Sequence, residues 1–201
     1  MERRLSRRGF LRQSALASVT TAMAGPASMA AAGDARSVGD SAVAEAEHIL
    51  ITLSVNGTRR PLQVEPRMTL AEVLRDALGL RGTKIGCNRG ACSACTVWLD
   101  DAPVCSCMLL AVDAADRRVT TIEGLADGEK LHPVQAAFVE YDAVQCGYCT
   151  PGLVMSCAAL LRDQPGAGAA TIRRAISGHT CRCGTYPHVI AAMLATAKTH
   201  S

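Results

Sequence analysis

Aromatic residues, long apolar runs and an excess of charge are all scarce in this sequence. Phe, Trp and Tyr make up only 3% of the 201 residues, which argues against the stacking platforms that bind nucleic-acid bases. After the N-terminal segment, no run approaches the roughly 20 apolar residues of a membrane-spanning helix. We find no candidate nucleophile or general base for a substrate, and no flavin-binding segment. We therefore expect neither a nucleic-acid-binding nor a membrane-spanning protein, and we expect any substrate chemistry to take place on another chain.

The first 32 residues have the layout of an export signal: a basic start, a weakly apolar stretch of Ala, Ser and Thr, and then small residues. Arg7 and Arg8 lie in the string SRRGFL, which predicts a twin-arginine signal rather than an ordinary secretory signal or a basic amphipathic helix. Cleavage is expected near Ala30 or Ala32. We thus expect a periplasmic protein that is exported already folded. Export in the folded state suits a protein whose cofactor is inserted in the cytoplasm before export.

The signal also accounts for the net positive charge. The whole chain has 21 Lys and Arg against 18 Asp and Glu, but residues 1–32 contain five Arg and one Glu. The remaining chain therefore has 16 basic and 17 acidic side chains. This near balance favours neither nucleic acid nor an anionic membrane surface as a partner.

After a flexible leader at residues 33–47, residues 48–125 predict a small α+β domain. Asn56-Gly57 is a strong hairpin signal between two stretches of alternating polarity. Thr69 is a candidate N-cap for a helix whose apolar residues fall on one face. A turn is expected from Asp100 to Pro103. The expected elements are two strands within residues 48–66, a helix at 70–80, and strands at 96–100 and 117–125.

Residues 126–201 change to a helical pattern, which predicts a second domain of four helices. Pro133 and Pro151 each suit the first turn of a helix, and the string QPGAGAA interrupts the chain after the second one. The expected helices lie at residues 132–143, 151–164, 171–179 and 188–198. One cysteine-containing loop precedes the second helix, and another precedes the fourth.

Ten cysteines follow the signal, and four of them form the first group. Cys87, Cys92 and Cys95 have the spacing C-x4-C-x2-C, and Cys107 follows further along, which is the plant-type pattern for a 2Fe–2S cluster. Such a cluster with its four thiolates carries a charge of about −2, which backbone N–H groups have to stabilise. The Gly, Ala and Ser residues around these cysteines let the loop wrap closely and direct N–H groups at sulfur.

A second group combines a C-x2-C pair, Cys146 and Cys149, with a C-x-C pair, Cys181 and Cys183. Four thiolates in two pairs suit a second 2Fe–2S cluster or a single zinc ion. Disulfides are a further alternative, because exported chains with an even number of cysteines often form them. Disulfides usually stabilise small proteins with a weak apolar core, whereas this chain is rich in Leu, Val, Ala and Ile. Adjacent cysteines are also badly placed for bridging within a pair.

The remaining cysteines and the histidines suggest no additional metal site. Cys105, two residues before Cys107, could be a spare thiol or an alternative ligand. Cys157 falls within the helix after Pro151, where we expect a packing role. The histidines lack the paired spacing of a Rieske-type site, and we expect cap, loop or surface positions for them. They are His48, His132, His179, His188 and His200.

Several strings together resemble the iron–sulfur subunit of the xanthine oxidase family of molybdenum hydroxylases, and in its exported form the small subunit of periplasmic aldehyde oxidoreductases. The strings are GTKIGCNRGACSACTVWLD, CSCMLLA, TTIEG, HPVQAAF, QCGYCTPG and CRCGTYPHVIAA. The resemblance covers roughly residues 48–198 and includes eight cysteines in two independent spacings.

The resemblance implies a β-grasp ferredoxin domain followed by a four-helix domain, with one 2Fe–2S cluster in each. Cys146, Cys149, Cys181 and Cys183 would hold the cluster nearest the molybdenum cofactor, and the plant-type cluster would lie further out. Gln145 and Cys183 would contact the molybdopterin across a subunit boundary. The partner molybdenum subunit would oxidise an aldehyde or heteroaromatic substrate with oxygen from water. This chain would pass the two electrons on singly.

The next electron carrier differs among relatives of this kind. Aldehyde-oxidoreductase relatives pass electrons to a flavin subunit, so we expect an FAD-containing partner. The string CRCGTYPHV also resembles small subunits of the isoquinoline-oxidoreductase type, which work without flavin and can feed a cytochrome c. Two alternatives of other classes are a stand-alone exported ferredoxin or redox sensor, and a disulfide-linked binding module.

Overall fold

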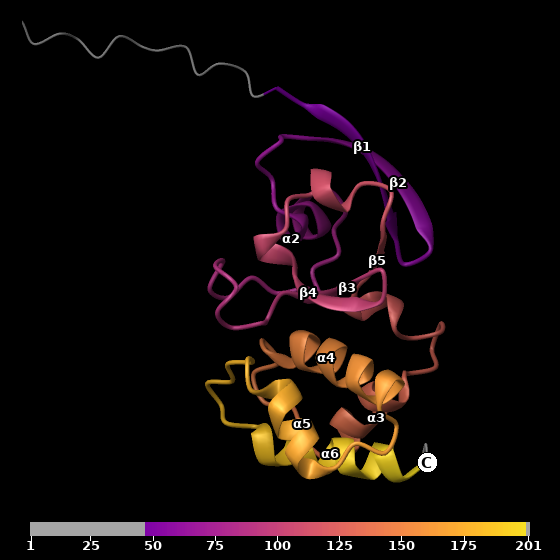
Figure 1. The fold of residues 1–201 in the computed structure, drawn as a ribbon, viewed down its shortest axis with the longest axis vertical. Helices are drawn as coiled ribbons and strands as arrows, with labels where there is room; N and C mark the ends of the chain where they lie inside the picture. Colours follow the sequence, from indigo (N-terminus) through magenta and orange to yellow (C-terminus); the bar gives the residue numbers. More distant parts are fainter. Residues whose placement is uncertain (1–46, 200–201) are drawn as a thin grey trace, which may run out of the picture. The chain divides into compact units, whose positions relative to one another are not determined.

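The computed structural model describes residues 47–199; the predicted signal at residues 1–32 and all but the last residue of the leader at 33–47 lie outside the described part. Figure 1 follows the chain from strand β1 to helix α6. The protein has a mixed α/β fold, as the sequence predicts, with a small sheet and five α-helices among the described residues. None of these helices is long and apolar enough to cross a membrane.

Five strands form one sheet in the order β2-β1-β5-β3-β4. β1 pairs parallel with β5, and the other neighbours pair antiparallel. The strands are β1 Ile49–Val55, β2 Thr58–Val64, β3 Thr96–Leu99, β4 Ala102–Cys105 and β5 Arg118–Thr120. Thr96 pairs with Cys105 at the open end of the β3–β4 hairpin. This register brings Cys95, which precedes β3, close to Cys107, which follows β4.

The β1–β2 hairpin turns at Asn56-Gly57, which confirms the hairpin signal. Both residues have positive φ, 49° and 76°, as a two-residue type I′ turn requires. The Asn56 side chain also fixes the turn against the loop after β5, because its Oδ1 accepts a hydrogen bond from the Thr121 N–H at 2.9 Å. Its Nδ2 donates to the Thr121 hydroxyl at 3.0 Å. The turn is therefore anchored to a segment 65 residues further along the chain.

The helix expected at residues 70–80 is shorter than predicted. Its N-cap is correct: Thr69 and Glu72 form a capping box in which each side chain accepts a hydrogen bond from the other's backbone N–H. The α-helix then gives way to a π-helical turn. The two segments are α2 Leu70–Glu72 and η1 Val73–Ala77. Gly79 follows the segment with φ +70°, a left-handed conformation that ends a helix and that glycine adopts without strain.

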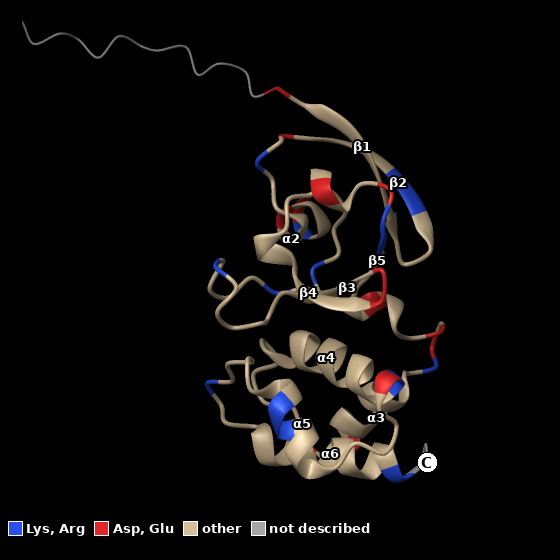
Figure 2. Cartoon of the chain, in the orientation of Figure 1, with Lys and Arg blue, Asp and Glu red and all other residues tan. Residues whose placement is uncertain are grey.

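The turn after β3 is two residues shorter than expected, because β4 begins at Ala102. Asp100 and Asp101 make the turn, both with positive φ, whereas Pro103 lies in strand β4. β4 is an edge strand of the sheet, and an edge is where a residue without a backbone N–H is tolerated. Exposed ion pairs link this turn to β5 at 2.7 Å, Arg117 to Asp100 and Arg118 to Asp101. Figure 2 shows acidic and basic segments of the chain close together near β5.

Four helices follow the sheet, and each lies within two residues of a predicted start. They are α3 Pro133–Glu140, α4 Thr150–Asp163, α5 Ala169–Ile176 and α6 Tyr186–Thr199. Pro133 and Pro151 occupy the first turns of α3 and α4, as predicted. The helices share an apolar core in which Phe138, Leu153 and Met193 are almost fully buried.

Helix α4 packs directly against strand β3 and the cysteine loop before it. The indole Nε1 of Trp98 in β3 donates to the carbonyl oxygen of Met155 in α4 at 2.9 Å. The Arg162 guanidinium lies 4.9 Å from the centre of the Trp98 ring, within the range of a cation–π contact. Near its first turn, α4 has Gly152 against the backbone of Ser93 and Ala94. The absence of a side chain at residue 152 therefore permits this contact.

We expect Gly152→Ala to destabilise the protein. The new Cβ would lie 2.3 Å from the Ser93 carbonyl oxygen, which is a backbone atom and cannot rotate away. Overpacking of this kind costs about 1–3 kcal/mol, which for a chain of this size lowers the Tm by roughly 3–10 °C. Thermal unfolding followed by circular dichroism measures the change.

Gly178→Ala is the matched control for this prediction. Its Cβ would also face Ser93, but at an ordinary contact distance of 3.5 Å from the Oγ. We expect the Tm of this variant to stay close to that of the parent protein. Equal Tm values for Gly152→Ala and the parent protein would contradict the close packing of α4 on the cysteine loop.

Candidate functional site

The first cysteine loop wraps around its own sulfur atoms with backbone N–H groups. The N–H groups of Arg89 and Ala91 donate to the Cys87 Sγ at 3.4 and 3.2 Å. The N–H of Gly90, whose φ is +71°, donates to the Cys107 Sγ at 3.4 Å. This is the arrangement expected of a loop that has to stabilise negative charge on sulfur.

The four thiols of this loop approach one another in two pairs. Cys87 and Cys92 line the same cavity, and Cys95 and Cys107 pack together in one buried cluster. Cys95 and Cys107 are buried, whereas Cys87 and Cys92 are partly exposed. Because each iron of a 2Fe–2S cluster takes two protein ligands, a division into two pairs suits such a cluster.

The surroundings act in opposite directions on two of these thiols. The backbone N–H of Arg89 lowers the pKa of Cys87 to about 7, which favours the thiolate that binds metal. Burial raises the pKa of Cys107 to about 11, so its thiolate needs a bound cation to offset the charge. The partly exposed Cys87 is thus readily deprotonated, whereas the buried Cys107 needs a bound metal to become a thiolate.

The second group of cysteines comes from two loops, one before α4 and one before α6. Cys149 directly precedes α4 and lies in the same buried cluster as Cys181 from the other loop. Both of these residues are buried, whereas Cys146 is exposed. Cys183 is half-buried and packs against the helical core. The structure thus joins the C-x2-C and C-x-C pairs through Cys149 and Cys181.

Thr185 stabilises negative charge on the sulfur of Cys181. Its hydroxyl lies 3.2 Å from the Cys181 Sγ. Burial raises the pKa of Cys181, but the Thr185 hydroxyl and N–H, together with Cys149 and the Gly184 N–H, lower the pKa to about 7. Burial raises the pKa of its neighbour Cys149 to about 12. Each cysteine group thus contains one thiol of lowered and one of raised pKa.

Tyr186 and His179 hold the second loop in place, a role that the sequence did not predict. The Tyr186 hydroxyl accepts the Cys181 N–H at 2.7 Å and donates to the His179 carbonyl oxygen at 2.9 Å. The buried His179 ring contacts the Ser156 hydroxyl at 2.8 Å, and burial lowers its pKa to about 4. His179 is therefore neutral and structural. Tyr186 directly follows the CRCGT string, and that position was the signal available in the sequence.

The two cysteine groups are in direct backbone contact. The N–H of Thr180, next to Cys181, donates to the carbonyl oxygen of Cys92 at 3.2 Å. Cysteines of both groups also line one cavity of about 270 Å³. The two sites are therefore neighbours, although they lie far apart in the sequence.

The chemistry of the donor set suits 2Fe–2S clusters. Among residues 47–199, no three His, Cys, Asp or Glu side chains converge closely enough to hold a single metal ion. A 2Fe–2S cluster needs only two thiolates at each iron, and eight thiols in two groups provide them. All ten cysteines are free thiols, which gives no support to a disulfide-linked module.

The two remaining cysteines differ in their surroundings. Cys105 lies at the end of β4, half-buried, with its sulfur 4.0 Å from the Ser93 hydroxyl. It also packs beside Cys95 and Cys107, so it is the spare thiol nearest the first group. Cys157 is fully buried in α4, where it packs in the helical core as expected.

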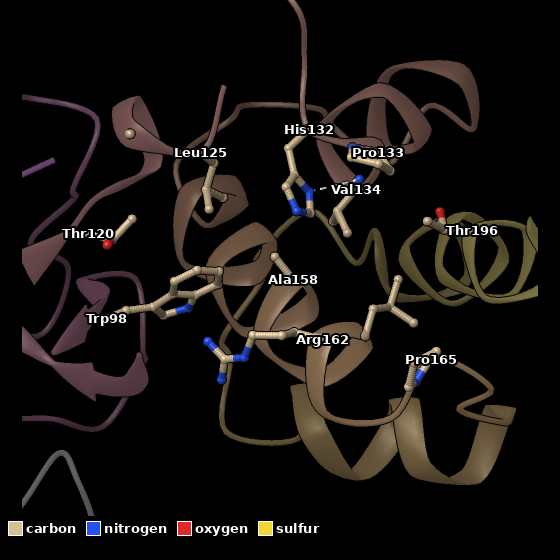
Figure 3. A pocket seen from close by; sticks show the side chains of 12 residues that line it. Trp98, Thr120, Leu125, His132, Pro133, Val134, Ala158, Arg162, Pro165 and Thr196 are labelled. Atoms are coloured by element: carbon tan, nitrogen blue, oxygen red, sulfur yellow. Dashed lines mark hydrogen bonds between the residues drawn. The ribbon is translucent and has the colours of Figure 1, made fainter. Parts of the chain in front are cut away.

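A separate cavity of about 540 Å³ lies between Trp98 and Arg162 on one side and His132 and Thr196 on the other (Figure 3). None of the described residues that line it is a cysteine or an acidic residue. The His132 ring nitrogen accepts the Val134 N–H at 3.2 Å and caps helix α3. This cavity therefore lacks the chemistry of the cysteine loops, and the site lies elsewhere.

Two protein families match successive parts of the chain. Residues 53–126 match the 2Fe-2S iron-sulfur cluster binding domain, and residues 121–194 match the 2Fe-2S binding domain. Together these matches include both groups of cysteines.

Curated relatives extend the likeness along most of the chain. The 6-hydroxypseudooxynicotine dehydrogenase complex subunit beta of Paenarthrobacter nicotinovorans is 46% identical over 143 residues, which cover 71% of this chain and 89% of the relative. The aldehyde oxidoreductase iron-sulfur-binding subunit PaoA of Escherichia coli K12 is 38% identical over 204 residues, which cover 94% of this chain and 86% of the relative.

Solved structures show the same likeness. Quinoline 2-oxidoreductase from Pseudomonas putida 86 contains a chain with a TM-score of 0.73 and 41% identity, covering 76% of this chain and 96% of that one. Aldehyde oxidoreductase from Desulfovibrio gigas gives a TM-score of 0.71 at 36% identity, covering 75% of this chain but only 17% of that longer chain. Taken with the two cysteine groups, these likenesses show that the chain belongs to the small iron–sulfur subunits of xanthine-oxidase-family molybdenum hydroxylases.

Proposed function

We propose that this chain is the electron-transfer subunit of a periplasmic molybdenum hydroxylase and that it holds two 2Fe–2S clusters. The observation that carries the proposal is the pair of cysteine groups joined by the Thr180–Cys92 hydrogen bond. Two redox centres in direct contact suit a protein that moves electrons, whereas a structural metal site needs no such neighbour. Relatives that are subunits of oxidoreductase complexes support the same class of function.

Each cluster has its own domain in this proposal. The first domain, residues 48–125, has the β-grasp ferredoxin fold, which the five-stranded sheet with a helix after its first hairpin supports. The second domain, residues 126–201, is the four-helix domain, supported by α3 to α6. The ligands of the first cluster are Cys87, Cys92, Cys95 and Cys107. The ligands of the second are Cys146, Cys149, Cys181 and Cys183.

The chain's own residues bind, shield and orient. A bound 2Fe–2S cluster supplies the ability to take up and release one electron. The N–H groups of Arg89, Gly90 and Ala91 stabilise negative charge at the first group, and the Thr185 hydroxyl does so at the second. Burial of the ligands nearest the domain interiors limits the access of water to both groups.

The partner molybdenum subunit docks next to the second group in this proposal. Gln145 and Cys146 are exposed side by side, as residues that face another subunit would be. Gln145 and Cys183 are the residues proposed to lie near the partner's molybdopterin. The substrate class is an aldehyde or a heteroaromatic compound, in line with relatives named for aldehyde, nicotine and quinoline oxidation.

Metal content is the first test of this function. We expect about four iron and four acid-labile sulfide per chain, with a red-brown colour that dithionite bleaches. Cys87→Ser and Cys146→Ser should each lower the iron content by about half, because each removes one ligand from a different cluster. Cys105→Ser is the matched control, and we expect it to keep all of the iron. Zinc, or no metal, in anaerobically prepared protein would contradict the proposal.

The electron acceptor is tested by the composition of the complex. We propose an FAD-containing partner subunit, so the complex purified from its native host should contain FAD besides molybdenum. Extraction with acid followed by fluorescence measures the flavin. A complex without flavin that reduces cytochrome c would favour the alternative acceptor, and a monomer without any partner would favour a stand-alone ferredoxin.

Export is tested through the proposed twin-arginine signal at residues 1–32. We expect Arg7→Lys combined with Arg8→Lys to leave the folded, iron-loaded complex in the cytoplasm, because this route reads the arginine pair. Fractionation followed by immunodetection of both subunits measures the location. The proposal includes export of the molybdenum subunit together with this chain, by means of this chain's signal. If the molybdenum subunit of the double variant still reached the periplasm, that part of the proposal would be wrong.

A further inference from the structure

Tyr148 lies at the point where the two cysteine groups meet. It sits in the string QCGYC, between Cys146 and Cys149 of the second group. Its hydroxyl donates a hydrogen bond of 2.7 Å to the carbonyl oxygen of Ile85. Ile85 is two residues before Cys87, so this hydrogen bond ties the second group to the first.

The Tyr148 ring lies close to the sulfur atoms of the first group. A Cβ built on Gly86 would be 3.8 Å from the ring Cε1 and 3.0 Å from the Cys92 Sγ. The ring therefore covers the glycine that precedes Cys87. A Cβ at residue 86 would crowd the Cys92 sulfur and would lie in ordinary contact with the ring.

The same ring forms part of the wall of the cavity of about 270 Å³ between the groups. Cys87 and Cys92 from the first group and Cys146 and Cys149 from the second also line it, and the surface of the cavity is mainly apolar. Half of the Tyr148 side chain remains exposed, so the ring lies between the cavity and solvent. Its removal would expose to water more of the space that cysteines of both groups share.

We infer that Tyr148 is a positioning residue for both redox centres: its hydroxyl holds the two cysteine loops together, and its ring covers part of the cavity between them. The inference rests on the proposed function, because it assumes that both groups hold a cluster. It adds that one side chain, which is not a ligand, sets the environment of both centres.

The physical consequence concerns reduction potentials. Reduction adds a negative charge to an iron–sulfur centre, and water stabilises that charge better than an apolar cavity does. Opening the cavity should therefore raise the potentials of both centres. It should also expose thiolates of both groups to chelators, which speeds the loss of iron.

Tyr148→Ala in the iron-loaded full chain is the test, with redox titration followed by electron paramagnetic resonance of both centres. We expect both potentials to rise and iron release to bathophenanthroline to become several-fold faster. Tyr148→Phe keeps the ring and removes the hydroxyl, so it should restore the potentials while iron release stays faster than in the parent protein. Tyr141→Phe removes a hydroxyl at the end of α3 and is the matched control, with no change expected. If Tyr148→Ala does not retain its iron, Tyr148→Leu takes its place with the same expected shifts.

The outcomes separate this inference from the proposed function. A parent chain without iron would overturn the proposed function. A parent chain with about four iron whose Tyr148 variants have unchanged potentials and iron release would overturn the inference alone. A shift at only one centre would also overturn it, because the role would then belong to one cysteine group.

Discussion

The close approach of helix α4 to the first cysteine loop is the constraint on which the rest of the site depends. Gly152 lies so near the Ser93 carbonyl oxygen that no side chain fits between them. With the helix in this position, Cys149 at its N-terminal end lies beside the cavity that Cys87 and Cys92 also line. The spacing of the two groups is therefore set by packing of the backbone, which allows less variation than flexible side chains would.

Charge is the second constraint, and the two groups meet it differently. The first loop uses backbone N–H groups, three of which donate to sulfur within five residues of Cys87. The second adds a side chain, the Thr185 hydroxyl beside Cys181, to the backbone N–H groups of Thr185 and Gly184. Hydrogen bonds to sulfur and exposure to solvent both affect the potential of an iron–sulfur centre. In the proposed function, two centres with different donors would thus be able to differ in potential even though both would have four thiolates.

Local features of the fold could be predicted from the sequence because they depend on neighbouring residues. The Asn56-Gly57 turn, the Thr69 cap and the proline starts of α3 and α4 are of this kind. The π-helical turn after α2 could not be predicted, because its packing in the core overrides the ordinary helical pattern. Strand β4 was missed because Pro103 indicates a turn unless the strand is known to lie at an edge.

The same distinction applies to the site. The spacing of the cysteines indicates ligand groups because ligands within one loop are close in sequence, but it carries no information on how two loops meet. That information lies in contacts between distant residues, such as Tyr148 with Ile85, 63 positions apart, and Trp98 with Met155, 57 positions apart. Both contacts involve α4 or the loop that leads into it. One segment therefore contributes ligands to one group and contacts to the other, so a change in its packing would affect both groups together.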